Sequence, residues 1–280
     1  MGELIQHKQR AIDFRSLHHS KHILVLPNAW DVASARVFEE AGFPAVATSS
    51  GGVAVALGYR DGQSISRREM LDAVARIAKV LAVPLSADME AGYGSTEHEI
   101  EEMTKGVISA GAVGLNMEDS TGNREKPLTD IEEQVRKLKV IRRTADSMDF
   151  PIFINARTDA FLHVSNDRIS EVIRRANSYK QAGADCIYTF GVLDPQSIAK
   201  LVESIDHPIN IRAGRGSPTI SELERLGVAR ASLATGPVCA ALGYLKKVAM
   251  EIHESGTYSN LLGCAISYDE LNKLATPKET

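Results

Sequence analysis

The feature that most constrains this fold is a turn from helix into strand that occurs four times along the chain. In each copy a helix-like segment runs to a glycine, and an apolar run follows within a few residues. The four glycines are Gly42, Gly111, Gly183 and Gly227. Glycine just past a helix adopts a left-handed backbone at low steric cost, which makes it the usual residue at such a turn. The repeated turn predicts a chain in which helices alternate with buried strands.

Eight short, largely apolar runs fit buried strands, and each is followed by a segment with helical character. Continuous apolar strands that alternate with helices indicate a parallel sheet covered by helices. Eight such units in 280 residues predict an α/β fold of the (β/α)8 TIM-barrel type. An open doubly wound sheet is the alternative, but TSSGGVAVALG after the second strand does not match its G-x-G-x-x-G phosphate loop. The predicted strands cover residues 22–27, 45–50, 84–90, 114–119, 151–158, 186–190, 208–213 and 229–234.

The starts of four helices are marked by the S/T-x-x-E pattern of a capping box, in which two side chains satisfy free backbone N–H groups. Apolar residues then recur at helical spacing, so that each helix presents one apolar stripe to the sheet. The predicted boxes pair Ser66 with Glu69, Thr96 with Glu99, Thr129 with Glu132, and Thr219 with Glu222.

No linker or low-complexity tract divides the chain, which predicts a single domain over residues 1–280. The C-terminal helical segment, about 237–280, is longer than one barrel helix requires. Its apolar residues suggest that it packs against something further, and a neighbouring subunit is the expected partner.

Composition excludes several classes of partner. With 44% apolar residues, 24% charged residues and a net charge of −4, the chain has no basic footprint for nucleic acid or an anionic membrane. No apolar run approaches the roughly 20 residues of a membrane span, and the N-terminus lacks the apolar core of a secretory signal. The three cysteines have neither metal-ligand spacing nor an even disulfide set. We therefore expect a cytoplasmic protein.

Acidic side chains gather where three consecutive predicted strands end, the end at which parallel barrels place catalytic groups. Asp88 and Glu90 end the third strand, Glu118 ends the fourth, and Asn155 and Arg157 end the fifth. Carboxylate oxygens are the ligands that Mg2+ prefers. For each acid alone, an ion pair with Arg157 or a helix cap is the better explanation, but three acids at adjacent strand ends favour a metal site.

Five regions, in this order and spacing, resemble the isocitrate lyase/phosphoenolpyruvate mutase superfamily. They are LPNAWD, ATSSGG with LGYRD, SADMEAGYG, GLNMEDS and INARTDAF, and the similarity runs from about residue 20 to 250. The resemblance implies a (β/α)8 barrel that binds Mg2+, with Mn2+ as the alternative ion. It implies action on small 2-oxo or 2-hydroxy carboxylic acids through a metal-stabilised enolate. It also implies subunits that exchange their last helix in a homotetramer built as a dimer of dimers.

The resemblance also implies roles for individual residues. Asp88 resembles the direct metal ligand, and Glu90 and Glu118 resemble acids that hold water around the ion. Asp61 is similar to another such acid, and Arg157 resembles the cation that neutralises substrate charge. The implied catalytic set is Arg157, Asp61 and Glu118, and the implied metal set is Asp88, Glu90 and Glu118. The implied substrate-binding residues are Trp30, Ser49, Ser50, Gly51, Asn155 and Arg157.

The chain departs from the best-known branches of that superfamily. Segment 121–130 reads TGNREKPLTD and lacks the K-[KR]-C-G-H loop of the cysteine-dependent lyases. The three cysteines, Cys186, Cys239 and Cys264, lie elsewhere and are expected to be buried fillers. Phe190 ends the sixth strand where the phosphonate enzymes carry a histidine, and their longer loop is also missing.

What is left resembles the branch of oxaloacetate decarboxylases and hydrolases, so we expect a Mg2+-dependent lyase or decarboxylase. Two alternatives stay open: a P–C hydrolase or mutase of the phosphonopyruvate type, and a barrel that binds a metabolite without catalysis. A Schiff-base aldolase is disfavoured because no predicted strand contains lysine. The loop at 124–126 could close over a substrate, and Arg212 and Arg215 could reach a distal carboxylate. Ordinary solvated charges explain these residues equally well.

Overall fold

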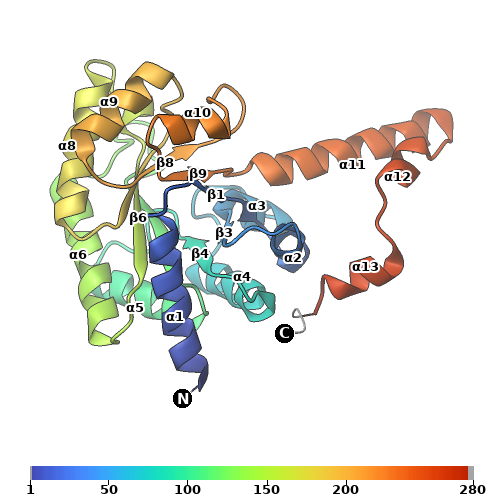
Figure 1. Cartoon of the computed structure of the whole chain (residues 1–280), viewed down its shortest axis with the longest axis horizontal. Coiled ribbons are helices and arrows are strands. Elements are labelled where there is room, and N and C mark those ends of the chain that lie inside the picture. The colour runs from blue at the N-terminus through green and yellow to red at the C-terminus, as the bar shows by residue number, and fades with distance from the viewer. Residues whose placement is uncertain (1, 277–280) are drawn as a thin grey trace.

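The computed structural model describes residues 2–276, and a parallel sheet that closes on itself lies at its centre (Figure 1). Within these residues the sheet has nine strands in the order β1-β9-β8-β7-β6-β5-β4-β3-β2. β1 pairs with β9, and β2 pairs with β3. Pro27 lies between β1 and β2 in the chain, and its carbonyl accepts the N–H of Ala47 in β3 at 2.9 Å, which closes the sheet. The strands are β1 Leu24–Leu26, β2 Asn28–Ala29, β3 Val46–Thr48, β4 Leu85–Asp88, β5 Gly114–Glu118, β6 Phe153–Thr158, β7 Cys186–Thr189, β8 Ile209–Arg212 and β9 Arg230–Ser232.

β1 and β2 are two parts of one barrel strand, interrupted because Pro27 has no N–H to donate to the sheet. The nine strands therefore occupy eight barrel positions. Eight of them lie within the predicted segments, whereas β2 lies just beyond the first, because that prediction ended at Pro27. The predicted barrel is confirmed. The four glycine turns are confirmed too, since Gly42, Gly111, Gly183 and Gly227 all have positive φ, between 83° and 97°.

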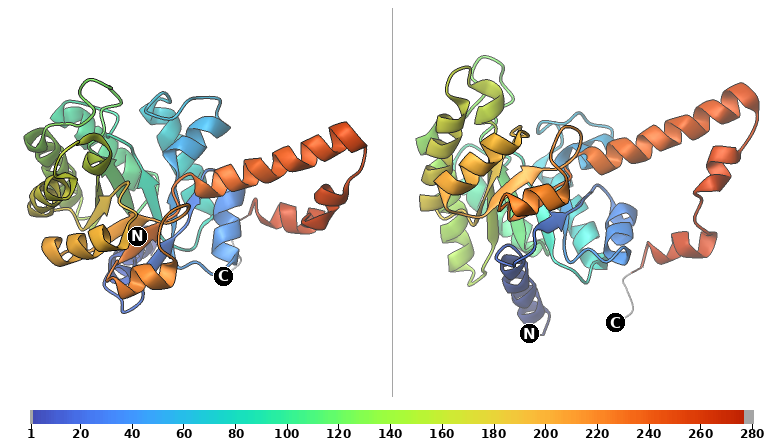
Figure 2. Two further views of the ribbon diagram at one scale, coloured as in Figure 1. Left: turned by 90° about the horizontal axis from the view of Figure 1, so that it is seen from above. Right: turned by 45° about the horizontal axis from the view of Figure 1, so that its top comes forward.

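Helices surround the sheet, as the two views of Figure 2 show. The outer helices are α2 Val32–Glu40, α4 Arg67–Val80, α5 Glu97–Ser109, α6 Ile131–Ser147, α8 Arg168–Gln181, α9 Pro195–Ile205 and α10 Ile220–Arg225. Two short helices, α3 Ser50–Ala56 and α7 Ala160–His163, lie in the loops after β3 and β6. At the opposite end of the barrel, the N-terminal helix α1 Gly2–Leu17 places Phe14 edge-on against Phe153 at 5.2 Å between ring centroids.

Three of the four predicted capping boxes are present, at Ser66, Thr96 and Thr219. The fourth prediction is wrong, because Asp130 rather than Thr129 caps α6, and it does so without a side-chain hydrogen bond. The Thr129 backbone forms hydrogen bonds with residues outside α6. Its N–H donates to the Asp119 carbonyl at 2.8 Å, and its carbonyl accepts from Arg175 at 2.9 Å. These bonds hold Thr129 in the loop, so the helix begins after it.

The C-terminal segment leaves the barrel as an arm (Figure 1). It consists of α11 Gly236–Ser255, α12 Ser259–Gly263 and α13 Tyr268–Lys273. Large apolar side chains along it are exposed in the single chain, among them Leu245, Leu262 and Tyr268. The predicted exchange of this segment between subunits stays a prediction. Across residues 2–276, no helix combines the length and the apolar character that crossing a membrane requires.

Candidate active site

The ends of β4, β5 and β6 bring together acids and the arginine that the sequence singles out. These strands are neighbours in the barrel, with Asp88 in register with Asn116, and Glu118 in register with Arg157. Because the strands are parallel, their carboxyl ends open at the same mouth of the barrel. Asp88, Glu118 and Arg157 are each half-buried there.

Asp88 is held in place from the turn between β3 and α3. The backbone N–H and the hydroxyl of Ser50 donate to its Oδ2 at 3.1 and 2.8 Å. The side-chain amide of Asn116 lies 3.5 Å from Oδ1, and Asn155 donates to the Asn116 amide oxygen at 2.6 Å. Among residues 2–276, Oδ1 has only this one long side-chain contact, which leaves it able to accept a further ligand.

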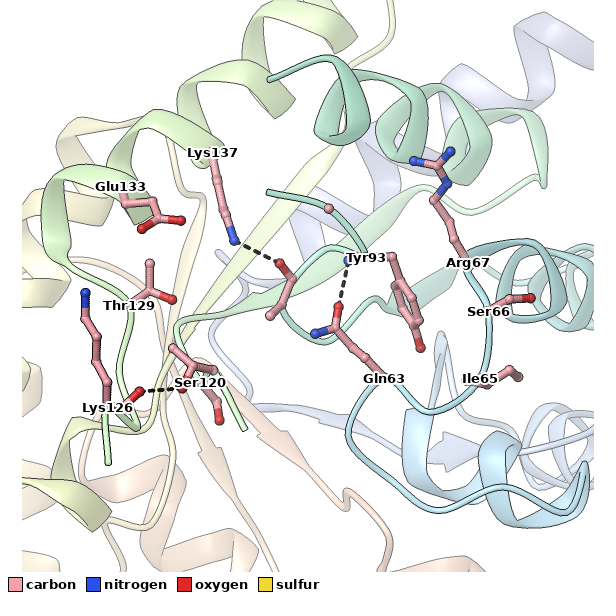
Figure 3. A pocket seen from close by; sticks show the side chains of 13 residues that line it. Gln63, Ile65, Ser66, Arg67, Tyr93, Ser120, Lys126, Thr129, Glu133 and Lys137 are labelled. Carbon is pink, nitrogen blue, oxygen red and sulfur yellow. Dashed lines mark hydrogen bonds between the residues drawn. The ribbon is translucent and has the colours of Figure 1, made fainter. Parts of the chain in front are cut away.

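Glu90 is bonded to two loop residues. The Tyr93 hydroxyl donates to Oε1 at 2.5 Å, and the backbone N–H of Gln63 donates to Oε2 at 2.6 Å. Figure 3 shows Tyr93 and Gln63 beside one another. Burial raises the pKa of Glu90, the nearby charges of Asp88 and Asp61 also raise it, and the bonds from Tyr93 and Gln63 oppose this increase.

Glu118 forms an ion pair with Arg157, at 2.9 Å between Oε2 and Nη1. The Arg157 Nε and Nη2 atoms donate to both carboxylate oxygens of Asp159, at 2.6 and 2.8 Å. The Phe190 ring lies against the guanidinium, with its centroid 3.8 Å from Cζ. Burial raises the pKa of Glu118 to about 8; Arg157 opposes this, and three neighbouring carboxylates add to it.

The loop after α3 brings Asp61 close to the first turn of that helix. A Cβ atom on Gly51 would lie 2.8 Å from Asp61 Oδ2, so only glycine lets the carboxylate approach this closely. Asp61 itself is exposed. The Ser49 hydroxyl accepts the N–H of Gly52 at 3.2 Å and caps α3. Asp61 therefore reaches the segment from Ser49 to Gly51.

Trp30 lines a different cavity, of about 650 Å³, together with Val53 and Leu57 near α3 and Ile77 of α4. Its side chain packs against the α3 backbone, since a Cβ atom on Gly52 would lie 2.8 Å from the Trp30 Cβ. Trp30 thus lies in a cavity between helices that both apolar and charged side chains line. Its predicted contact with substrate stays a prediction.

Within residues 2–276, no three His, Cys, Asp or Glu side chains lie close enough together to form a ready-made metal site. Glu90 and Glu118 are each bonded to other partners, so of the three predicted ligands Asp88 is the carboxylate available for direct binding. Mg2+ takes few protein ligands and keeps several waters, so one direct carboxylate with further acids nearby suits its chemistry. The excess of acids over arginine also leaves negative charge for a cation to offset. The residues therefore fit Mg2+.

A cavity of about 560 Å³ opens beside this cluster (Figure 3). Gln63 and Tyr93 lie on one side of it, and the loop after β5 contributes Lys126. Lys126 pairs with Asp130 at 2.6 Å, and residues 121–126 are exposed. The predicted closure of this loop over a substrate stays a prediction.

Sequence reasoning missed several residues that bond to the site. Asn116 could have been found, because alternation along β5 turns it to the same side as Glu118. Tyr93 lies in the GYG segment but carried no separate signal, and Gln63 lies in a loop without periodicity. Arg212, half-buried at the end of β8, has a weak 3.5 Å contact with the carbonyl of the exposed Arg215.

The cysteines divide into two groups. Cys186 is buried within β7, and burial raises the pKa of its thiol to about 12. Cys239 and Cys264 are exposed, so the expectation that all three are buried is wrong. Both lie in the arm that extends from the barrel, where the single chain provides little to cover them.

A closed parallel barrel with carboxylates and Arg157 at its mouth defines this protein as an α/β barrel of the TIM type. Residues 14–253 match the family model described as phosphoenolpyruvate phosphomutase, and the chain belongs to that family, within the isocitrate lyase/phosphoenolpyruvate mutase superfamily expected from its sequence.

Three comparisons illustrate the membership. A crystal structure from Burkholderia cenocepacia J2315, provisionally described as a lyase/mutase, has a TM-score of 0.90 and 32% identity over 98% of this chain and 99% of that one. The 2-methylisocitrate lyase of Escherichia coli K12 is 27% identical over 92% of this chain and 89% of its own. The oxaloacetate decarboxylase of Pseudomonas putida GB-1 is 29% identical over 79% of this chain and 75% of its own. The last two relatives are named for methylisocitrate and oxaloacetate, which are small carboxylic acids.

Proposed function

We propose that this protein is a Mg2+-dependent lyase or decarboxylase that acts on a small 2-oxo or 2-hydroxy dicarboxylic acid. The observation that carries the proposal is the Asp88 carboxylate, which Ser50 fixes through Oδ2 while Oδ1 keeps acceptor capacity. It stands beside the ion pair of Glu118 and Arg157, so an acidic ligand site and a fixed cation share one mouth.

Asp88 would hold the ion directly, and Glu90, Glu118 and Asp61 would hold it through water. When bound, Mg2+ supplies a Lewis acid that stabilises negative charge on the 2-oxo oxygen as the neighbouring bond breaks. Ser50 keeps Asp88 in one orientation, which spares the reorientation that a mobile carboxylate would need.

Arg157 contributes a positive charge that is oriented before substrate arrives. Glu118, Asp159 and Phe190 hold the guanidinium on three sides, so little reorganisation accompanies the reaction. A substrate carboxylate at the mouth would compete with Glu118 for the Nη1 group. The same cation then offsets the charge that develops during cleavage.

Arg212 supports a substrate with a second carboxylate. It ends β8 on the other side of the barrel mouth, and its only side-chain hydrogen bond within residues 2–276 is the weak contact with Arg215. Its guanidinium therefore keeps donors for a distal acid group. Loss of carbon dioxide needs no cysteine acid, in keeping with the placement of Cys186 inside β7 and of the other two in the arm.

A phosphonopyruvate-type mutase or hydrolase is the second candidate, because the matching family model carries the phosphomutase description. Phe190 weighs against it, since this ring packs on Arg157 at the strand end where the phosphonate enzymes of the resemblance carry histidine. A panel of acids separates the two candidates by their products.

The test is proton and phosphorus NMR of the protein with oxaloacetate, phosphonopyruvate, isocitrate, 2-methylisocitrate and 2,3-dimethylmalate, with Mg2+ and then with EDTA. We expect metal-dependent consumption of one of the four phosphorus-free acids. Asp88→Asn should lose at least about a hundredfold in activity, because the direct ligand loses its charge. Asp146→Asn, an exposed change on α6, is the matched control and should keep full activity. Full turnover by Asp88→Asn would contradict the metal assignment.

A further inference from the structure

Three residues beside the metal-ligand candidates share an uncommon backbone conformation. Gln63, Glu90 and Tyr93 have φ angles of 57°, 48° and 53°, in the left-handed region that side chains other than glycine and asparagine rarely adopt. Such strain persists only where surrounding contacts hold it, and it clusters at functional sites. Here the three strained residues are each other's hydrogen-bond partners.

The bonds among them form a closed set. Tyr93 donates its hydroxyl to Glu90 Oε1 at 2.5 Å, and Gln63 donates its backbone N–H to Glu90 Oε2 at 2.6 Å. The Tyr93 backbone N–H donates to Gln63 Oε1 at 2.8 Å, a bond drawn in Figure 3. Both oxygens of the Glu90 carboxylate therefore have a fixed donor, and the carboxylate cannot rotate without breaking one of them.

These bonds join two loops that are far apart in sequence. Glu90 and Tyr93 follow β4, whereas Gln63 lies two residues after Asp61 in the loop after α3. Holding Gln63 therefore also holds the Asp61 carboxylate near Gly51. The set is one mechanical link between the acids at the end of β4 and the acid of the neighbouring loop.

We propose that Tyr93 and Gln63 are positioning residues that fix Glu90 and Asp61 for metal binding. The proposal rests on the proposed function, because it gives these two acids their role around the ion. Tyr93 and Gln63 act through Glu90 and need not touch substrate. Removing them should weaken Mg2+ binding without removing the direct ligand Asp88.

The test is Tyr93→Phe, which keeps the ring and removes only the hydroxyl. The Mg2+ dissociation constant is measured by isothermal titration calorimetry without substrate, and we expect it to rise at least fivefold with an unchanged melting temperature. Tyr59→Phe is the matched control, because the Tyr59 hydroxyl donates to Glu69 at 2.9 Å in an exposed tyrosine–glutamate pair outside the acid cluster. This control should bind Mg2+ as the wild type does.

Raising the Mg2+ concentration should restore the turnover of Tyr93→Phe to within about twofold, which a general loss of folding would not allow. Gln63→Gly is a second variant: it accepts the left-handed backbone but loses the acceptor for Tyr93, and it should also weaken Mg2+ binding. Asp167→Gly, at another left-handed residue, the N-cap of α8 with φ of 46°, controls for the effect of a glycine substitution itself. Wild-type Mg2+ affinity in Tyr93→Phe and Gln63→Gly would overturn the proposal.

Asp88→Asn separates this proposal from the proposed function. If Asp88→Asn abolishes Mg2+ binding while Tyr93→Phe leaves it unchanged, only the positioning role fails. If the wild type binds no Mg2+, the proposed function and the positioning role for metal both fail. Hydrogen exchange at the Gln63 amide then still reports on the link: about tenfold faster exchange in Tyr93→Phe means that the loops are joined for another purpose.

Discussion

Glu118 at the end of β5 and Arg157 near the end of β6 form an ion pair 2.9 Å long, between residues that are in register on neighbouring strands. The pair is partly buried, and its cation is also held by Asp159 and packed on Phe190. Ion pairing with Arg157 was the alternative explanation for each acid taken alone, and for Glu118 that pairing is present. It does not exclude a metal role, because Glu118 can hold water around an ion while it stays beside Arg157.

Arg157→Lys should lower kcat/KM by at least about a hundredfold, or roughly 2.7 kcal/mol. Lysine carries the charge but cannot donate to Glu118 and both oxygens of Asp159 at once. Steady-state kinetics on the substrate found by NMR provides the measurement. Arg174→Lys is the control, because Arg174 pairs with Glu171 at the surface, and its activity should stay within twofold. Activity above a tenth of wild type in Arg157→Lys would refute a requirement for this geometry.

Stability should fall as pH falls below about 6.5, partly through His18. Burial lowers the pKa of His18 to about 3, so the folded chain keeps it neutral while the unfolded chain protonates it. The unfolded chain therefore binds more protons, and the free energy of unfolding falls by roughly 1.4 kcal/mol per pH unit between 6.5 and 3. Above pH 6.5 His18 is neutral in both the folded and the unfolded chain, so it no longer changes the free energy of unfolding.

Urea unfolding of wild type and His18→Phe at pH 7, 6 and 5 tests this. Phenylalanine preserves the stack on Phe153, where the ring centroids are 4.0 Å apart. Between pH 7 and 5, the free energy of unfolding should fall by about 2 kcal/mol less in the variant than in the wild type. His98→Phe, an exposed change on α5, should keep the wild-type pH dependence. Identical pH profiles for wild type and His18→Phe would exclude His18 as the cause.

Arg230→Met should leave the protein as stable as wild type or more stable. Arg230 is fully buried in the barrel, and within residues 2–276 its Nη1 and Nη2 atoms have no hydrogen-bond partner. Replacing buried ion pairs by apolar side chains of similar size is often neutral or stabilising by about 1–4 kcal/mol, and the Arg230 charge has no partner to offset its lost hydration.

Arg36→Met is the contrasting variant, because the buried Arg36 is paired with Glu39 and Glu40. Its loss leaves Glu39 buried without a cation and should cost about 3–5 kcal/mol. Chemical denaturation measures both variants. Strong destabilisation by Arg230→Met as well would mean that the guanidinium has a bound partner in solution.

The arm formed by α11, α12 and α13 should be covered by other copies of the chain. We propose the homotetramer expected from the sequence, because exposed apolar residues on this scale mark an interaction surface. Light scattering should give about four times the chain mass of 30.4 kDa. Leu245→Lys combined with Leu262→Lys should lower that mass, whereas a monomeric wild type would refute the proposal.

The sequence by itself determined the barrel and the position of its mouth. Strand periodicity and the helix-to-strand glycines are local signals, and parallel strands leave only one end at which Asp88, Glu118 and Arg157 can meet. Where a local signal competed with distant bonds, as at Thr129, the sequence prediction failed, because Asp119 and Arg175 hold that residue outside the helix.

Only the tertiary structure decided how the site residues are used. Local sequence cannot show that Tyr93 and Gln63 occupy both oxygens of Glu90, that Ser50 fixes Asp88, or that Phe190 packs against Arg157. Except for the bond between Tyr93 and Glu90, which lie in one loop, these contacts join different loops or strand ends. Their geometry depends on how the whole barrel closes, because a hydrogen bond forms only when atoms from both segments come within about 3 Å.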